Sequence, residues 1–320
     1  MSTDQRIPWQ AKFLALALIW GSSFLFMKVA LAALHPIQIA TARILAAALI
    51  LIMLLRMTGG RLPRERRVWG HLAVSSIFLT ALPFTGFVVG ETRVASAIAG
   101  IGNATTPIAA VLFAIVLLPA ERLTGAKLAA VLVGFLGVII IAEPWNTAGR
   151  PDPLGFLIVV LSGACYGLGW TYNRRLLAQA DLGGLSQPAA LLLCGSALML
   201  PVILIWWLVG GADAPWSLVA HAGEPGHYPV WLALLCVALL GFVGTGIAYM
   251  LQFDVVRAAG AVASTTVTYL IPVVSVVLGV FVLGEHLGAA QLLGFVVVLG
   301  CAYAINAKPE KARHSAALPR

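Results

Sequence analysis

Charged residues are scarce in this sequence. Only 10% of the 320 residues are Asp, Glu, Lys or Arg, whereas 61% are apolar and the mean hydropathy is +0.98. Soluble globular domains carry about 25% charged residues, so these values exclude a water-soluble domain of useful size. The longest polar segment, 210–229, is short, and we expect it to be an external loop.

Cysteine is also sparse, and the motifs of metal centres and intramembrane enzymes are missing. The four cysteines show no C-x-x-C pair and no histidine spacing suited to zinc. There is no G-x-S-x-G motif and no pair of aspartates within an apolar run. We therefore expect no cofactor and no metal site, and the sequence does not favour an enzyme.

Long apolar runs, by contrast, follow one another along the whole chain. A helix needs roughly 20 residues to cross about 30 Å of hydrocarbon, and ten runs come close to that length. The fold class predicted is an all-α polytopic membrane protein with ten transmembrane helices. The predicted spans are 13–34, 37–55, 68–89, 94–118, 124–142, 154–172, 186–209, 230–251, 261–283 and 288–306.

The distribution of basic residues predicts the orientation of these spans. If the N-terminus is cytoplasmic, sixteen of the 20 Lys and Arg residues fall in cytoplasmic segments. Only Lys28, Arg93 and Arg150 fall outside, and Arg43 lies within the second span. Because Lys and Arg near span ends favour the cytoplasmic side, both termini are expected in the cytoplasm. The net charge of +8 follows from this topology and gives no reason to expect nucleic acid as a partner.

Five spans in each half give the two halves opposite orientations, so any similarity between them is an inverted repeat. Trp20 and the glycine after it match Tyr166 and the glycine after it, and Pro107 matches Pro272. Inverted repeats let two halves exchange inward-open and outward-open shapes around a site near the membrane midplane. The predicted domains are a first five-helix repeat at 1–150, a second, inverted repeat at 151–306 and a cytoplasmic tail at 307–320.

Polar and aromatic side chains within the spans are the candidates for a substrate site. In lipid a polar side chain faces protein or a water-filled cavity, because its exposure to hydrocarbon is costly. Trp20, Ser23 and Met27, for example, recur at helical spacing on one face of the first span. Small polar residues also serve helix packing and aromatic residues the interfacial belt, so a structural role is the alternative for each. The predicted substrate-binding residues are Trp20, Ser23, Met27, Phe84, Phe87, Asn103, Thr106, Tyr166, Trp170, Thr245, Tyr249, Thr265, Thr268 and Tyr269.

Prolines and charged residues near this set are candidates for hinges and gates. Arg43 is costly within a span unless it is paired or reaches water, so it is a candidate partner for a substrate carboxylate. Glu91 and Arg93 are predicted to form an exposed pair at the outer mouth. Because proline removes a helix hydrogen bond, the predicted hinges are Pro83, Pro107 and Pro272.

Acidic residues are missing from the interior of every predicted span. An antiporter that expels cationic drugs needs a buried carboxylate to bind proton and drug in turn, so the absence counts against that class. It favours a facilitative carrier, a hypothesis that a stoichiometric flux of protons with substrate would contradict. Phosphorylated cargo is also disfavoured, because only Arg43 and Lys28 could serve as central cations.

Several motifs together resemble one family, the drug/metabolite transporter superfamily and specifically its EamA-type members. The motifs are W-G-S-S-F at 20–24, Arg43, Pro107, L-G-E at 283–285, Gln291 and Gly294. The likeness covers 10–306 and departs at 118–121, where L-P-A-E keeps only the acid of L-G-E. The resemblance implies ten helices in two inverted repeats and export of small metabolites. Within the family the chain looks most like bacterial exporters of aromatic and other neutral amino acids.

The resulting hypothesis is a multi-pass carrier of the bacterial inner membrane that exports small neutral metabolites by alternating access. Aromatic and other neutral amino acids are the expected cargo, and the lipid bilayer is the other expected partner. The alternatives are an exporter of drugs, nucleotide-sugars or other metabolites from the same superfamily, or a channel. The sequence leaves the oligomeric state open, a monomer included.

Overall fold

The computed structural model describes residues 7–118, 125–146, 150–178, 180, 182–211, 228–252, 254–255, 258 and 267–307. Within these ranges every regular element is a helix. The first part of the chain forms α1 (Trp9–Ala30), α2 (Pro36–Met57), α3 (Arg66–Ser76), the π-helical turn η1 (Ile77–Ala81), α4 (Leu82–Glu91), α5 (Ser96–Asn103), α6 (Thr106–Leu117) and α7 (Gly125–Ala142). The second part forms α8 (Pro153–Leu176), α9 (Ser186–Trp206), the π-helical turn η2 (Trp207–Gly211), α10 (Val230–Ala238), the π-helical segment η3 (Leu239–Ile247), α12 (Val267–Leu283) and α13 (Ala289–Ala307).

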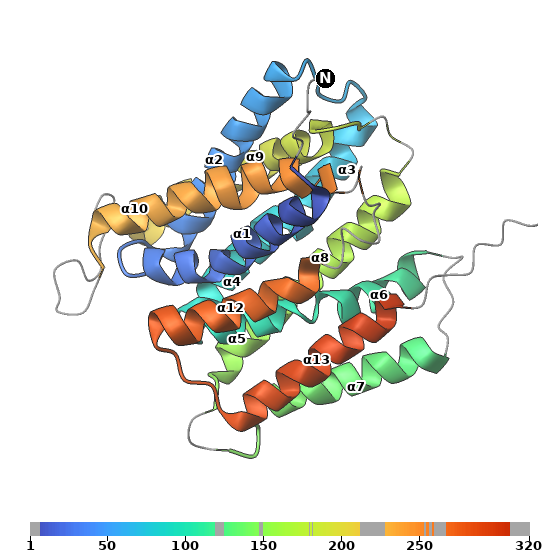
Figure 1. The fold of residues 1–320 in the computed structure, drawn as a ribbon. Helices are drawn as coiled ribbons and strands as arrows, with labels where there is room; N and C mark the ends of the chain where they lie inside the picture. The colour runs from blue at the N-terminus through green and yellow to red at the C-terminus, as the bar shows by residue number, and fades with distance from the viewer. Residues whose placement is uncertain are drawn as a thin grey trace, which may run out of the picture.

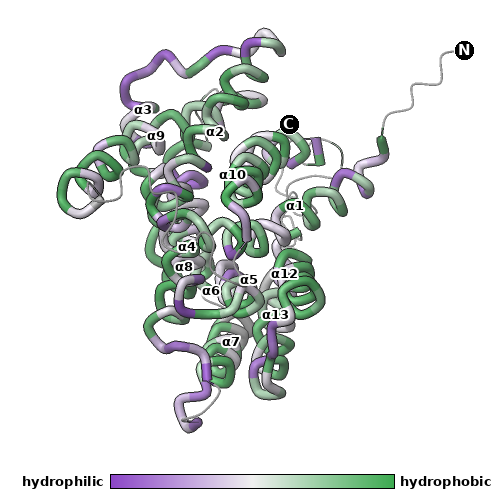
Figure 2. Tube along the Cα trace, turned by 90° about the vertical axis from the view of Figure 1, so that its left-hand side faces the viewer, coloured by the Kyte–Doolittle hydropathy of each residue, from purple (hydrophilic) through white to green (hydrophobic). Residues whose placement is uncertain are grey.

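Seven helical segments in the described ranges are long and apolar enough to cross a membrane. Shorter apolar helices, Val131–Ala142, Val267–Leu283 and Ala289–Ala304, fall where the fifth, ninth and tenth spans are predicted. Figure 2 shows apolar residues along the helix bodies and polar residues gathered at the connecting ends. The chain is therefore an all-helical, multi-pass membrane protein, and the count of ten spans stays a prediction.

Several of the described spans change their backbone hydrogen bonding along their length, among them the third and the fourth. The third span passes from α3 through η1 into α4, with Pro83 in the first turn of α4. The fourth span breaks between α5 and α6, with Pro107 in the first turn of α6. Proline has no backbone N–H, which a residue in the first turn of a helix does not need. For the same reason it cannot donate a hydrogen bond to a carbonyl oxygen of the preceding helix. Pro272 lies inside α12, and the hinge role of all three prolines stays a prediction.

The helices of the two halves pack in a reciprocal pattern. The first helix of one half, α1, packs on α12 of the other, and α8 packs on α6. The pairs α2 with α9 and α7 with α13 also join the halves, and Figure 1 shows α7 and α13 lying together at one side of the bundle. This exchange of partners is the pattern that two related halves predict, and the inverted repeat itself stays a prediction.

Glycines allow the closest of these contacts. A Cβ built on Gly21 of α1 would lie only 2.9 Å from the carbonyl oxygen of Ile271 in α12. A Cβ built on Gly167 of α8 would lie 2.7 Å from the amide nitrogen of Ala110 in α6. Real Cβ atoms do not approach backbone so closely, so these two positions need glycine. They are the same two glycines that the sequence alignment of the halves brought into register.

Candidate functional site

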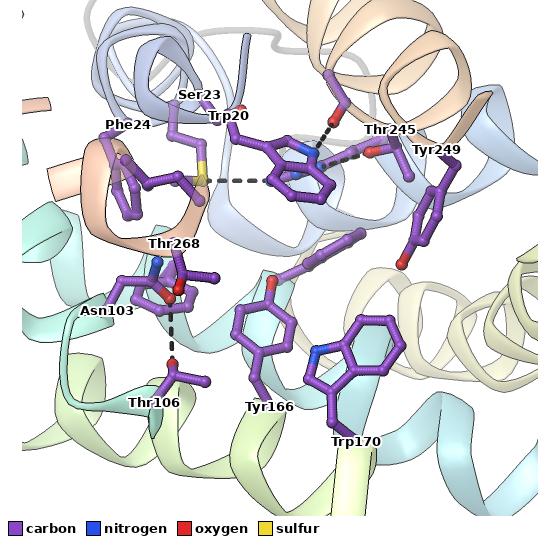
Figure 3. A pocket seen from close by; sticks show the side chains of 16 residues that line it. Trp20, Ser23, Phe24, Asn103, Thr106, Tyr166, Trp170, Thr245, Tyr249 and Thr268 are labelled. Carbon is purple, nitrogen blue, oxygen red and sulfur yellow. Dashed lines mark hydrogen bonds between the residues drawn. The ribbon is translucent and has the colours of Figure 1, made fainter. Parts of the chain in front are cut away.

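A cavity of about 130 Å³ lies among α1, α2, α4, the α5–α6 break, α8, η3 and α12. Figure 3 shows its side chains converging from both halves of the chain. The described residues that line it are Trp20, Ser23, Phe24, Met27, Arg43, Phe84, Phe87, Asn103, Thr106, Tyr166, Trp170, Gly244, Thr245, Tyr249, Thr268 and Ile271.

Aromatic rings form much of the wall. Tyr166 stacks on Phe87 with ring centroids 5.9 Å apart, and it meets Phe84 edge-on at 6.4 Å. Phe87 in turn meets Phe24 edge-on at 5.5 Å. Trp170 lies one turn along α8 from Tyr166 and is 49% exposed. Each such ring pair contributes roughly 0.5–1.5 kcal/mol beyond its buried area, so the aromatic wall is held in a defined shape.

Trp20 joins α1 to the π-helical segment η3 across the cavity. Its indole Nε1 donates to the carbonyl oxygen of Gly244 at 3.1 Å. The hydroxyl of Ser23, one turn further along α1, donates to the carbonyl oxygen of Ile19 at 3.1 Å. The indole thus ties the first half of the chain to the second at the cavity wall.

Arg43 is a buried cation whose described contacts are with uncharged groups. Its Nε donates to the hydroxyl of Thr245 at 3.3 Å, and its Nη1 lies 3.8 Å from the sulfur of Met27. The guanidinium carbon lies 3.9 Å from the centroid of the Phe84 ring, a distance typical of a cation–π contact. None of the described carboxylates lies within ion-pair distance of Arg43, so its charge is not neutralised by the protein.

The break between α5 and α6 supplies the polar side of the cavity. Since residue 107 is proline, the carbonyl oxygen of Asn103 lacks the amide donor of a continuous helix. The hydroxyl of Thr106 donates to the carbonyl oxygen of Gly163 at 3.0 Å and lies 3.5 Å from the side-chain oxygen of Asn103. Thr268 of α12 lies opposite this break (Figure 3). Amide, hydroxyl and carbonyl groups therefore lie together in this part of the cavity wall.

Twelve of the 14 predicted substrate-binding residues lie in this wall, together with Arg43. Tyr269 is not among them, because its hydroxyl donates to the carbonyl oxygen of Ala302 at 2.7 Å. Its neighbour Thr268 faces the cavity instead, and successive helix residues point about 100° apart. Thr265 lies outside the described residues. The role of the twelve in binding substrate stays a prediction.

Sequence reasoning missed three lining residues, Phe24, Gly244 and Ile271. Phe24 carried a signal, since it lies one helical turn after Trp20 on the same face of α1. Ile271 is indistinguishable by type from a lipid-facing residue, and Gly244 contributes its backbone rather than a side chain. No sequence pattern marks either of them.

The predicted exposed pair of Glu91 and Arg93 is wrong. The side chain of Glu91 is 0% exposed, and Arg93 instead approaches Asp152, with Nη1 and Oδ1 3.7 Å apart. Glu91 is the last residue of α4 and faces the bundle, whereas Arg93 lies in the following turn and faces out. The helical segment Arg66–Glu91 therefore ends on a buried acid, two residues beyond the predicted span 68–89.

Glu285 holds the start of α5. One carboxylate oxygen accepts from the amide of Ser96 at 2.6 Å, and the other accepts from the amide of Ala97 at 2.9 Å. The hydroxyl of Ser96 adds a bond at 3.1 Å. Carboxylates are favourable at helix N-termini, and this one ties the turn after α12 to α5.

These features define a class, a multi-pass helical membrane protein with a central cavity of aromatic and polar side chains, as in solute transporters. More particularly, the chain belongs to the EamA-like transporter family, whose model matches residues 8–142 and again residues 153–307. The two matches divide the chain close to the predicted boundary between its repeats.

Similar proteins span nearly the whole chain. The uncharacterized inner membrane transporter YedA of Escherichia coli (strain K12) is 24% identical over 305 residues, which cover 93% of this chain and 90% of the relative. A protein of the same strain named "Probable amino-acid metabolite efflux pump" is 22% identical over 89% of this chain and 90% of its own. A solved crystal structure superimposes with a TM-score of 0.59 at 20% identity, over 92% of this chain and 95% of that one. At this identity the structural likeness shows the fold alone.

Proposed function

We propose that this transporter exports small neutral metabolites, foremost aromatic and other neutral amino acids, by alternating access. The observation that carries the cargo assignment is Arg43, a buried cation beside aromatic rings that forms no ion pair with the described acids. A carboxylate would complete it, because guanidinium and carboxylate form paired, charge-assisted hydrogen bonds. The rings beside Arg43 would then pack the apolar side chain of the cargo.

The polar side of the cavity suits the other end of a zwitterion. The carbonyl oxygen of Asn103, left without a helical donor by Pro107, and the hydroxyl of Thr106 could accept hydrogen bonds from an ammonium group. Discontinuous helices present backbone groups to substrates in this way in many transporters. Arg43 and the α5–α6 break thus lie on different walls of one small cavity, as a neutral amino acid requires.

The charge of the cavity and the packing of the helices weigh against two of the alternatives. A nucleotide-sugar would need several cations for its phosphates, whereas Arg43 is the single basic residue among the lining residues described. A channel would not need helices that exchange partners between the halves. Drugs, nucleotide-sugars and channel activity remain the alternatives to be tested.

The cellular assignment rests on the relatives and on charge. One relative is named as an inner membrane transporter and another as an amino-acid metabolite efflux pump, and we extend both to this chain as a proposal. The distribution of Lys and Arg supports cytoplasmic termini. The two family matches support a division into repeats at 1–150 and 151–306, followed by a tail at 307–320. A facilitative mechanism stays part of the proposal, since it rests on the absence of acids from the interior of the predicted spans.

Uptake into proteoliposomes tests the cargo assignment. Purified protein would be offered labelled aromatic, aliphatic and charged amino acids, a quaternary ammonium dye and a sugar phosphate. We expect saturable entry of the neutral amino acids. In Arg43→Gln the uptake efficiency should fall roughly 10- to 150-fold, since a hydrogen bond to a charged group contributes about 1.5–3 kcal/mol.

Two controls make this result specific. Arg43→Lys keeps the charge but not the planar fork, so it should lose less than Arg43→Gln. Val116→Ala changes a residue that is 77% exposed on the outside of α6 and should transport normally. Entry of only the dye or the sugar phosphate would reject neutral amino acids as the cargo. Uptake of neutral amino acids that is equal in Arg43→Gln would reject Arg43 as the partner of the cargo carboxylate.

A further inference from the structure

The carboxyl group of Glu91 is fully buried and has no hydrogen-bond partner on either oxygen. It ends α4, one turn beyond Phe87 in the cavity wall. An ionised carboxylate here would lose its hydration and gain no donor in return, which is among the most costly arrangements in a protein interior. A neutral, protonated carboxylic acid avoids most of that cost.

Lys28 of α1 is a neighbouring cation, yet it does not bind the carboxyl group. Its Nζ donates to the backbone carbonyl oxygens of Glu91 at 2.7 Å and Val94 at 3.0 Å. These two carbonyls belong to the turn that joins α4 to α5. Lys28 therefore ties that turn to α1, and the two carbonyl oxygens stabilise its ammonium group.

The other charged groups around Glu91 are already engaged. Arg43, from α2, lies over the Phe84 ring, two turns back along α4. Glu285, from the turn after α12, is held by the amides that begin α5. At the start of α8, Asp152 caps the helix and lies near Arg93.

Uncharged groups complete the surroundings. The phenol of Tyr166, from α8, stacks on Phe87. α5 contributes no ionisable side chain, since its sequence runs from Ser96 to Asn103 without one. Lys28 is the cation whose ammonium already lies against the turn that begins at Glu91, where backbone carbonyl oxygens hold it.

The position of Glu91 connects it to the closure of the cavity. Met27 and Phe87, which line the cavity, are 1% and 3% exposed and belong to the same buried cluster as Val88 and Val94. Of this cluster, Met27, Phe87, Val88 and Val94 lie toward the end of the bundle where α1 and α4 finish. Any opening of the cavity toward that end must separate these residues and admit water to Glu91.

We propose that Glu91 is a proton-binding site that controls the opening of this end of the cavity. With the proton bound, the neutral acid stays buried and Lys28 holds the α4–α5 turn to α1. When the O–H bond breaks and the proton passes to water at this end, the carboxylate attracts the ammonium of Lys28. Nζ then leaves the two carbonyl oxygens, and the turn is released from α1. Low pH favours the sealed form, and rising pH favours opening.

The link from this site to transport rests on the proposed function, whereas the protonation of Glu91 does not. Infrared spectroscopy of the full chain in lipid nanodiscs detects the carbonyl stretch of a protonated carboxylic acid. We expect that band near neutral pH, its loss in Glu91→Gln, and its retention in Glu65→Gln, which changes an exposed carboxylate. Absence of the band, or a band that persists in Glu91→Gln, overturns the proposal.

Thiol labelling tests the opening itself. In a background without the four native cysteines, Val94→Cys reports the sealed turn and Thr92→Cys, at an exposed position, corrects for the intrinsic effect of pH on thiols. The ratio of their labelling rates should rise with pH, by up to about tenfold per unit for one proton. In Glu91→Gln the ratio should stay constant.

An equal rise with and without Glu91 overturns the proposal. If Glu91→Gln does not fold, the infrared band of the unsubstituted protein and the labelling ratio must still titrate together, and separate midpoints overturn it as well. Neither readout uses a cargo, so a wrong cargo assignment and a wrong proton site give different results.

Discussion

Single residues decide where charge and close packing can exist inside this bundle. Arg43 is stabilised by a hydroxyl, a thioether and a ring face, all of which leave its formal charge intact. Gly21 and Gly167 have no Cβ atom, so each allows the backbone of its helix to pack directly against the backbone of another helix. The cavity depends on both kinds of position, because the glycines set the helix distances that bring its walls together.

Replacing either glycine by alanine should destabilise the protein. The added methyl group would overlap backbone atoms, and overpacking of this kind typically costs about 1–3 kcal/mol. The midpoint of thermal unfolding in detergent should therefore fall in both Gly21→Ala and Gly167→Ala. Gly300→Ala in α13 is the matched control, because nothing lies within 4 Å of its added Cβ. Equal midpoints for all three variants would contradict the close contacts.

At this scale the sequence predicted which polar residues lie together, because lipid makes polarity informative, whereas their role in binding stays a prediction. A polar side chain in an apolar helix avoids hydrocarbon and faces protein or a cavity. Most of the selected residues accordingly lie in one cavity wall. The prediction failed for Tyr269, where two adjacent polar residues of α12 compete and only packing decides which one faces the cavity. It also failed for Glu91, because the direction of a side chain at a helix end depends on where the helix stops.

At the scale of elements, the cavity is built where helices are least regular. The α5–α6 break, the turn η1 and the segment η3 all lie in spans that contribute to its walls. π-Helical turns are frequently found at functional sites, and a break frees backbone groups for a ligand. Pro107 indicates the break from the sequence alone, whereas nothing in the sequence of η3 distinguishes it from an α-helix. The π-helical segments were therefore beyond prediction.

Pro107→Ala should make the fourth span more stable and less active. Alanine supplies an amide that can bond to the carbonyl oxygen of Asn103, so α5 and α6 can join into one helix. We expect a higher thermal midpoint and slower uptake of cargo. Pro201→Ala, inside α9 and away from the cavity lining, should raise stability without slowing uptake. Unchanged uptake in Pro107→Ala would show that the break is not needed for transport.

For the whole molecule, the two ends of α1 are tied to different partners. At one end Lys28 holds the α4–α5 turn. At the other end Lys12 pairs with Asp254, with Nζ and Oδ2 2.5 Å apart and both side chains partly exposed. Alternating access requires each end to separate in turn. The overall helical plan was predictable from hydropathy, but which helices meet across the halves depends on packing and became visible only in the structure.

The pair of Lys12 and Asp254 should influence the balance between the two open forms. Breaking it with Lys12→Ala or Asp254→Ala should change the uptake rate by no more than about fivefold, since partly exposed ion pairs contribute roughly 0–1 kcal/mol. The exchanged pair, Lys12→Asp with Asp254→Lys, should restore the rate. An exchanged pair no better than the single variants would show that the contact has no role in gating.

The fluorescence of the half-exposed indole of Trp170 should report whether the cavity is occupied. Indole emission shifts toward shorter wavelengths when water around the ring is replaced by apolar groups, and a cargo seated beside Trp170 would do this. Comparing the unsubstituted protein with Trp170→Phe isolates the contribution of this one ring from the 9 tryptophans of the chain. Occupancy of the cavity could then be followed by light alone, without a label on the cargo or a membrane to separate two compartments.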